Sequence, residues 1–306
     1  MMTQRHTTAQ IRHPRPRPRQ GHDGIEVFAI PRDALPCVLM ADVEENVLRN
    51  AGAPWNMFSS NDYWRRNYSE LQAEDREIIR RVSDFFVSAC AGGPPVQRAI
   101  DVGAGTNLYP ALLMLPWAER ILLAEFSKSN VLWLHDQLAD SSSPWRWDHF
   151  WHEMQRGKGY ADIDRPHERL RNACASEQGH AGIEQVSVFD LAKARWNLGT
   201  MFFVAESITE DPAEFGAAVA SFVGALTPGA PFAAAFMAGS NGYPVDGTHF
   251  PALPIEPDDV ERHITALGVH ELSVDLLETS HRVRDGYTGM IVATGFAGDE
   301  SDASDQ

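Results

Sequence analysis

The sequence predicts an α/β fold: a Rossmann-like, doubly wound sheet of seven strands with a terminal antiparallel hairpin, preceded by an N-terminal helical cap. Three observations predict it. Short apolar runs alternate with helical patterns from Arg98 onward, which is typical of a largely parallel sheet. The first run leads into a glycine turn, and an acid follows at or beside the end of each of the first three runs.

The composition limits the class of protein. The chain has 306 residues, 43% of them hydrophobic, which suffices for one large α/β domain. Its formal net charge of -16 argues against a nucleic-acid partner, because phosphate binding needs a basic face. No apolar run approaches the length of a membrane span, and MMTQRHTT lacks a signal-peptide core. The three cysteines have no paired spacing, so we expect a cytoplasmic protein without a metal site.

Four segments are expected along the chain. Residues 1–24 contain IRHPRPRPRQ, a basic proline-rich tail that cannot build a core. Residues 25–95 form the helical cap, with helices expected at Asp42–Arg49 and Ser69–Cys90. Residues 96–297 form the α/β domain, and residues 298–306 form an acidic tail.

Within the α/β domain, the pattern predicts an irregular Trp- and His-rich insertion over 144–180, in which Trp145, Trp147 and Trp151 pack a surface helix, and a hairpin over 243–254. The last two strands have no helix between them and are therefore expected to be antiparallel. The expected strands are Arg98–Val102, Arg120–Ala124, Glu184–Phe189, Met201–Ala205, Phe232–Met237, Glu271–Glu278 and Thr288–Gly295; the expected helices are Tyr109–Leu115, Lys128–Leu138, Pro212–Leu226 and Pro257–Leu267.

The acids at the strand ends suggest the ligand. In open α/β sheets, ligands bind beyond the carboxyl ends of the strands. Gly103 and Gly105 let the backbone approach a ligand, and Glu125 follows at about the spacing of a ribose-binding acid. The third glycine of a dinucleotide fingerprint is missing, and no Walker lysine follows. With Asp190 after the third strand, the pattern fits a nucleoside without a pyrophosphate, such as S-adenosylmethionine (SAM).

Four motifs carry a family resemblance over residues 59–295. They are DYWRRNY before the domain, IDVGAGTNLY at the glycine turn, EFSKSN after the second strand and FDL after the third. The chain resembles class I SAM-dependent methyltransferases, and among them the nicotinamide, phenylethanolamine and indolethylamine (thioether) methyltransferases. We therefore assign cofactor binding to Tyr63, Tyr68, Asp101, Gly103, Gly105, Asn107, Tyr109, Glu125, Asn130, Asp190, Leu191 and Ala205.

One departure concerns the acceptor. Amine methyltransferases of this family often place an acid at the end of the fifth strand, but no acid occurs from Ala233 to Tyr243. A thioether or pyridine-like nucleophile carries no proton and needs no base. The absence of an acid at the end of the fifth strand therefore favours such acceptors. We assign catalytic roles to Tyr63 and Glu206, Glu206 as a base or substrate anchor. We assign acceptor contacts to Glu206, Met237, Tyr243, Asp246 and His249.

The expected reaction is methyl transfer to a thioether sulfur or a nitrogen of a small metabolite, with methionine S-methylation as one hypothesis. Three alternatives stay open. The first is N-methylation of a pyridine-like or amine substrate. The second is transfer or cyclisation of the cofactor's aminobutyl group, and the third is a protein that binds SAM without turnover. We expect a small-molecule substrate, no nucleic-acid or membrane partner, and a monomer or homodimer.

Overall fold

The computed structural model describes residues 47–140, 142, 144–175, 181–279 and 286–298. The expected tail at 1–24 lies outside them, as does the expected tail at 298–306 apart from Gly298. The helices are α1 Ser60–Asn67, α2 Ala73–Ala89, α3 Tyr109–Met114, α4 Lys128–Ala139, α5 Asp148–Met154, α6 Pro166–Ala173, α7 Pro212–Ala225 and α8 Pro257–Thr265. The strands are β1 Val96–Val102, β2 Ala118–Glu125, β3 Gly182–Gln185, β4 Leu198–Phe202, β5 Pro231–Ala238, β6 Tyr243–Val245, β7 Thr248–Phe250, β8 His270–Glu278 and β9 Gly289–Phe296.

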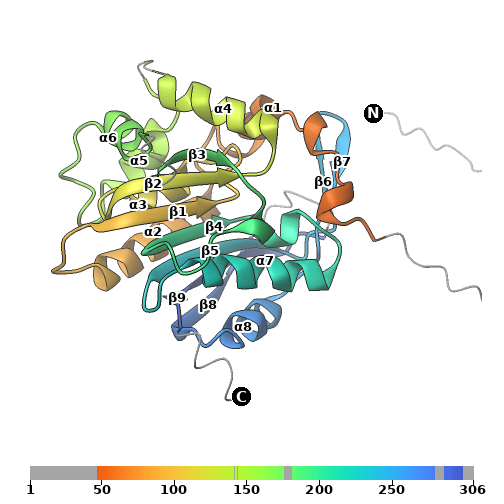
Figure 1. The fold of residues 1–306 in the computed structure, drawn as a ribbon. Coiled ribbons are helices and arrows are strands. Elements are labelled where there is room, and N and C mark those ends of the chain that lie inside the picture. Colours follow the sequence, from red (N-terminus) through yellow and green to blue (C-terminus); the bar gives the residue numbers. More distant parts are fainter. Residues whose placement is uncertain (1–46, 141, 143, 176–180, 280–285, 299–306) are drawn as a thin grey trace, which may run out of the picture. The chain divides into compact units, whose positions relative to one another are not determined.

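The main sheet has seven strands in the order β3-β2-β1-β4-β5-β9-β8, which confirms the predicted fold class (Figure 1). Strands β1 to β5 pair in parallel, and β9 is antiparallel to both β5 and β8. The order reverses between β1 and β4, so β1 and β4 flank the position where ligands bind in such sheets. The predicted hairpin is present as β6 and β7.

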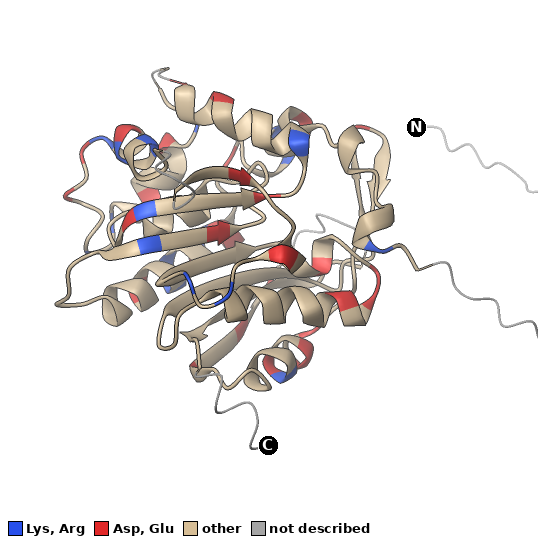
Figure 2. Cartoon of the chain, in the orientation of Figure 1, with Lys and Arg blue, Asp and Glu red and all other residues tan. Residues whose placement is uncertain are grey.

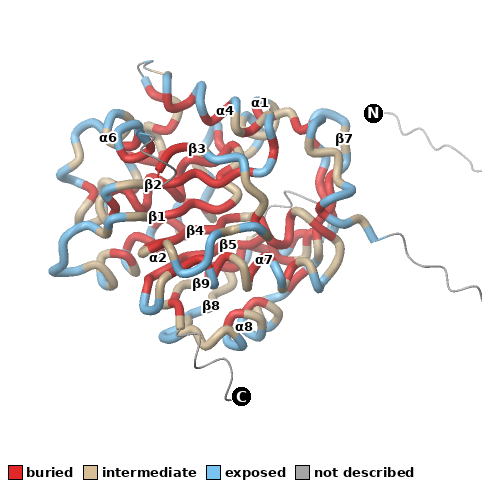
Figure 3. The backbone as a smooth tube through the Cα atoms, viewed as in Figure 1, coloured by how far each residue is buried: buried red, intermediate tan, exposed pale blue. Residues whose placement is uncertain are grey.

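Both faces of the sheet are covered by helices. Successive residues of a strand point to opposite faces, so a buried strand contributes side chains to an apolar cluster on each face. In β5, Ala233, Ala235 and Met237 join one apolar cluster with residues of α2, α3 and α4. Phe232 and Phe236 join a second cluster with residues of α7 and α8. Figure 3 shows the central strands buried along most of their length. The two clusters hold the sheet rigid, so the strand ends are fixed in position.

Helix α2 packs one of its faces into the hydrophobic core. Its apolar residues recur at helical spacing, and Ile78, Val82 and Phe86 are fully buried in the first cluster. The helix packs against α3, α5, β5 and β9. Its first turn therefore lies next to the end of β5, and this position matters for the site below.

The segment 144–180 differs from the expected irregular insertion. Within its described part, α5 and α6 are regular helices, and Trp145, Trp147 and Trp151 are buried in the first cluster. The indoles thus fill the core beside α3 instead of packing a surface helix. The expected pattern was missed because short helices rich in aromatic and charged residues show little 3.6-residue periodicity.

Three expected elements have different ends. Strand β3 ends at Gln185 and β4 at Phe202, and short 3₁₀ helices follow at Val188–Asp190 and Ala205–Ser207. Residues 47–49 of the expected helix Asp42–Arg49 are not helical, and the rest of it lies outside the described residues. In both strands the apolar run continues into the loop, where residues such as Val188 and Val204 line a cavity.

In the part of the chain that the structure describes, no helix has the length and apolarity needed to cross a bilayer. The Lys and Arg positions of the described residues are spread over several elements, including β1, β2, α6 and α8 (Figure 2).

Candidate active site

The glycine turn after β1 lies in close contact with the ends of two neighbouring strands, β2 and β4. Gly103 and Gly105 have φ values of +65° and +53°, which side-chain-bearing residues rarely adopt. A Cβ on Gly103 would lie 2.5 Å from a methyl group of Val204 after β4. The N–H groups of Gly103 and Ala104 both donate to Ala124 O of β2, at 2.8 and 3.1 Å. The turn thus needs glycine for packing, and its open side faces a cleft.

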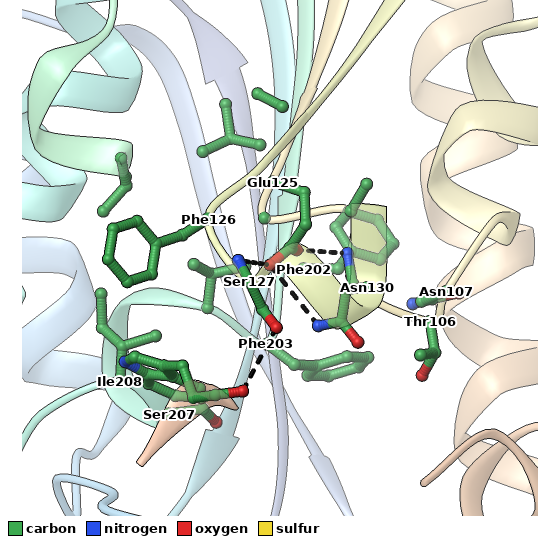
Figure 4. A pocket seen from close by; sticks show the side chains of 18 of the residues that line it. Thr106, Asn107, Glu125, Phe126, Ser127, Asn130, Phe202, Phe203, Ser207 and Ile208 are labelled. Atoms are coloured by element: carbon green, nitrogen blue, oxygen red, sulfur yellow. Dashed lines mark hydrogen bonds between the residues drawn. The ribbon is translucent and has the colours of Figure 1, made fainter. Parts of the chain in front are cut away.

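The end of β2 holds a fixed carboxylate. Glu125 is 6% exposed, and its Oε2 accepts the Gly105 N–H at 2.7 Å. Its Oε1 accepts the Ser127 N–H at 2.6 Å and the Asn130 Nδ2 at 3.4 Å (Figure 4). Burial raises the pKa of Glu125, and these donors act in the opposite direction. The three donors orient a carboxylate toward the cleft before any ligand arrives.

The cleft itself encloses a cavity volume of about 100 Å³. Its walls are apolar on the side of Val188, Leu191 and Ile208, and polar at the glycine turn. Thr106 Oγ1 and Asn107 Nδ2 are buried there and have no hydrogen-bond partner among the described residues. Buried polar atoms without partners are costly, so the cleft is suited to a ligand that is apolar at one end and accepts hydrogen bonds at the other.

An aromatic wall closes one side of the cleft. Tyr63 lies 6.2 Å from Tyr68 and 5.9 Å from Tyr243, measured between ring centroids. Tyr68 in turn packs against Trp147 at 5.8 Å, and the His149 side chain bonds its backbone carbonyl at 3.0 Å. Trp147, directly before α5, and His149 of α5 therefore support a residue of the cleft from behind.

A second cavity lies on the other side of this wall, and we call it the α2 cavity. The two cavities share Tyr63, Tyr68 and Phe203. Phe203 follows β4 directly and has a φ of +60°, a strained conformation for a side-chain-bearing residue that is typical of functional sites. The α2 cavity has a volume of about 300 Å³ and is lined by Tyr63, Arg66, Asn67, Tyr68, Gln72, Ala73, Glu74, Asp75, Phe203, Met237 and Met290.

The structure brings most predicted cofactor residues together. The cleft is lined by Tyr63, Tyr68, Gly103, Gly105, Asn107, Glu125, Asn130 and Leu191, and by Tyr243 from the predicted acceptor set. Met237 lines the α2 cavity. The other predicted site residues line neither: these are Asp101, Tyr109, Asp190, Ala205, Glu206, Asp246 and His249.

Two of these outlying residues have partners in the fold. Asp101 accepts the Thr200 hydroxyl at 2.7 Å behind the glycine turn, and burial raises its pKa to about 8. The fully buried Glu206 accepts the Met237 N–H at 3.0 Å and the Ser207 hydroxyl at 2.9 Å through Oε1. Glu206 thus connects the loop after β4 to β5.

Other outlying residues flank the site. Asp190 is exposed at the end of the 3₁₀ helix whose neighbours Val188 and Leu191 line the cleft. The Tyr109 ring stacks on Phe150 at 5.1 Å in the core. Asp246 and His249 lie in the β6–β7 hairpin, where the Asp246 N–H donates to Asp62 of α1 at 3.2 Å.

Three residues of the site were missed in the sequence. Ser127 stands two residues after Glu125 in EFSKSN, but it bonds the carboxylate through its backbone N–H, so its residue type gave no signal. Phe203 gave no signal, since its backbone conformation is not encoded in its residue type. Asp75 did give one: it stands three and four residues before Ile78 and Ile79, so this acid falls on the buried face of an amphipathic helix.

Comparison with known proteins identifies the family. The model of the NNMT/PNMT/TEMT family matches residues 47–293. No curated protein sequence matches the chain. Solved structures similar to it include the N-methyltransferase NodS from Bradyrhizobium japonicum (13% identity, 78% of this chain and 93% of that one, TM-score 0.42). Magnesium protoporphyrin IX methyltransferase from Synechocystis is another (12% identity, 78% and 92%, TM-score 0.44).

The chain belongs to the NNMT/PNMT/TEMT family, so it is a SAM-dependent methyltransferase and its cofactor is SAM. The cleft fits this cofactor. Glu125 offers a carboxylate for a ribose diol, and Asn107 Nδ2 and Thr106 Oγ1 offer unused polar atoms for the amino-acid end. The apolar side at Val188 and Leu191 offers a surface for the adenine ring.

Proposed function

We propose that this methyltransferase moves a methyl group to a thioether sulfur or a nitrogen of a small metabolite held in the α2 cavity. The observation that supports it is the shared wall: Tyr63, Tyr68 and Phe203 border both the cofactor cleft and the α2 cavity. The two cavities meet at these side chains, so an acceptor in the α2 cavity would lie next to the methyl group of the cofactor. We further propose that the protein acts in the cytoplasm as a monomer or homodimer.

In such a reaction the chain's own residues position the acceptor, exclude water and attract the positively charged sulfur. SAM supplies a methyl group already activated by a positive sulfur. The protein must hold the acceptor in line with that methyl group and exclude water. Tyr63 and Tyr68 present aromatic faces at the junction, which attract a positively charged sulfur. Met237 and Met290 give the acceptor cavity an adaptable apolar side.

The test is product analysis by mass spectrometry after incubation with methyl-labelled SAM and a panel of thioethers, pyridines and amines, methionine included. We expect a labelled methyl on one class of panel member together with S-adenosylhomocysteine. Methylthioadenosine without a methylated product would contradict the proposal and indicate chemistry on the aminobutyl group. Binding of SAM without any product would indicate a non-catalytic protein.

A further inference from the structure

The α2 cavity is negatively charged at one end. Glu74 and Asp75, in the first turn of α2, both line it, and Arg66 of α1 is the one cationic side chain among the described residues that line it. Arg66 is already engaged, with Nε 3.1 Å from Asp62 Oδ2 and a terminal nitrogen 3.5 Å from Pro244 O. The described lining therefore holds more negative than positive charge, while Phe203, Met237 and Met290 give the cavity an apolar side.

Asp75 is the buried member of this acidic pair. It is 2% exposed, and among the described residues no Lys, Arg or His lies within ion-pair distance of it. Its polar neighbours are the backbone of Gln72 and the hydroxyl of Tyr109. Glu74 differs, because its side chain accepts the Thr279 hydroxyl from the end of β8. A buried carboxyl without an opposite charge is costly in an empty cavity, and a cationic ligand removes that cost.

Asp75 lines the same cavity as the end of the fifth strand, β5, where the sequence has no acid. Met237, near the end of β5, lines the same cavity as Asp75 and is apolar. We infer that Asp75 is the acceptor-binding carboxyl of this enzyme, and that the acceptor is an amine with a compact apolar body whose positive charge is held by Asp75. This inference rests on the proposed function and favours its nitrogen branch.

The proton balance follows from this placement. An amine bound as an ammonium must lose a proton before its nitrogen can attack, and the Asp75 carboxylate can take that proton while the nitrogen keeps the electron pair. Burial raises the pKa of Asp75 to about 7, partly offset by the backbone of Gln72 and by Tyr109, with Glu74 adding a small further rise. The carboxyl can therefore both release and accept a proton near neutral pH.

The test compares ligands that share a benzyl body and differ in one group: benzylamine, benzyl alcohol and benzyl methyl sulfide. Binding is measured by calorimetry at pH 8 with S-adenosylhomocysteine saturating the cofactor cleft. We expect the wild type to bind benzylamine about tenfold tighter than benzyl alcohol, and Asp75→Asn to abolish this difference. Asp84→Asn is the matched control, since Asp84 is an exposed acid of the same helix. Asp75→Glu should restore part of the preference.

A second readout uses benzyltrimethylammonium, whose charge does not change with pH. Its affinity for the wild type should fall as pH drops from 8 to 6, because Asp75 becomes protonated, and should be flat in Asp75→Asn. Among the described residues, the other titratable and charged groups that line the cavity or interact with Asp75 are Glu74 on α2, Arg66 and Tyr63 on α1, Tyr68 after α1 and Tyr109 on α3. All of them are unchanged in that variant.

Three outcomes would overturn the inference: a wild type that does not prefer benzylamine, an Asp75→Asn variant that keeps the preference, or a preference for the sulfide. SAM affinity, measured separately, must match the wild type in each variant, which reports that the fold is intact. Methylation of a sulfide with no amine preference would refute the role of Asp75 and leave the proposed function standing. Binding without any methylated product would refute the proposed function instead.

Discussion

The two cavities on either side of the aromatic wall are built differently. The cofactor cleft is formed largely by backbone turns and strand ends of the central sheet, where Gly103, Gly105 and Glu125 hold fixed positions. The α2 cavity is formed by side chains from α1, α2, β5 and β9, segments far apart in the sequence. The difference suggests that a common donor is bound by the fold itself, whereas the choice of acceptor depends on the few side chains that cover it.

The largest effect should come from closing the cleft at the glycine turn. Gly105→Val should weaken SAM binding by about 100-fold or more in calorimetry, because its φ of +53° strains a branched residue and its side chain enters the space of the ligand. Gly229→Val is the control, since Gly229 has a φ of +74° and nothing within 4 Å of its Cβ. Equal SAM affinity in both variants would mean that the turn is only structural.

A smaller loss is expected at the carboxylate of the same cleft. Glu125→Gln should lower SAM affinity by roughly 10- to 100-fold, the usual worth of charge-assisted hydrogen bonds. Glu184→Gln, an exposed position on the adjacent strand β3, should leave the affinity within about twofold. If both variants bind SAM equally well, Glu125 does not contact the cofactor.

Substitutions of Glu206 distinguish a structural role of this residue from a catalytic one. Glu206→Ala should lower the free energy of unfolding by about 1–3 kcal/mol in urea denaturation, because the buried Met237 N–H loses its acceptor. Glu206→Gln keeps an oxygen at that place and should be much less destabilised. Both roles leave Glu206→Gln stable, so kcat separates them: a structural role leaves the kcat of this variant largely unchanged, whereas a base role makes it collapse.

The smallest effect concerns pH. Burial raises the pKa of Asp101 to about 8, far above its unfolded value near 3.8, so the folded state binds the proton more tightly. Its contribution is therefore fully present below about pH 4 and is lost as pH rises to about 8. In urea denaturation, Asp101→Asn should gain stability relative to the wild type between pH 6 and pH 8.5. A constant difference would show that Asp101 does not titrate in this range.

The cofactor cleft was largely predictable, because glycines and strand-end acids recur at fixed spacing and backbone geometry follows from them. Gly103, Gly105, Glu125 and Asn130 all line it as expected. The sheet was predictable for a similar reason, since apolar runs separated by helices leave few possible topologies.

The α2 cavity was not predictable in the same way. Its lining depends on which helix face meets which strand end, and periodicity alone gives no partner for that face. The acid on the buried face of α2, Asp75, was visible in the sequence, but only the packing of α2 beside Met237 gives it a meaning. Phe203 depends on a backbone conformation that its residue type does not predict.

The central claim is that the cleft and the α2 cavity are the donor and acceptor compartments of one site, joined at Tyr63, Tyr68 and Phe203. A crystal structure with S-adenosylhomocysteine and benzylamine tests it most directly. We predict S-adenosylhomocysteine in the cleft with its ribose at Glu125 and its sulfur at the aromatic wall, and the amine in the α2 cavity with its nitrogen beside Asp75. An amine bound elsewhere, or a cofactor sulfur pointing away from the wall, would contradict the account.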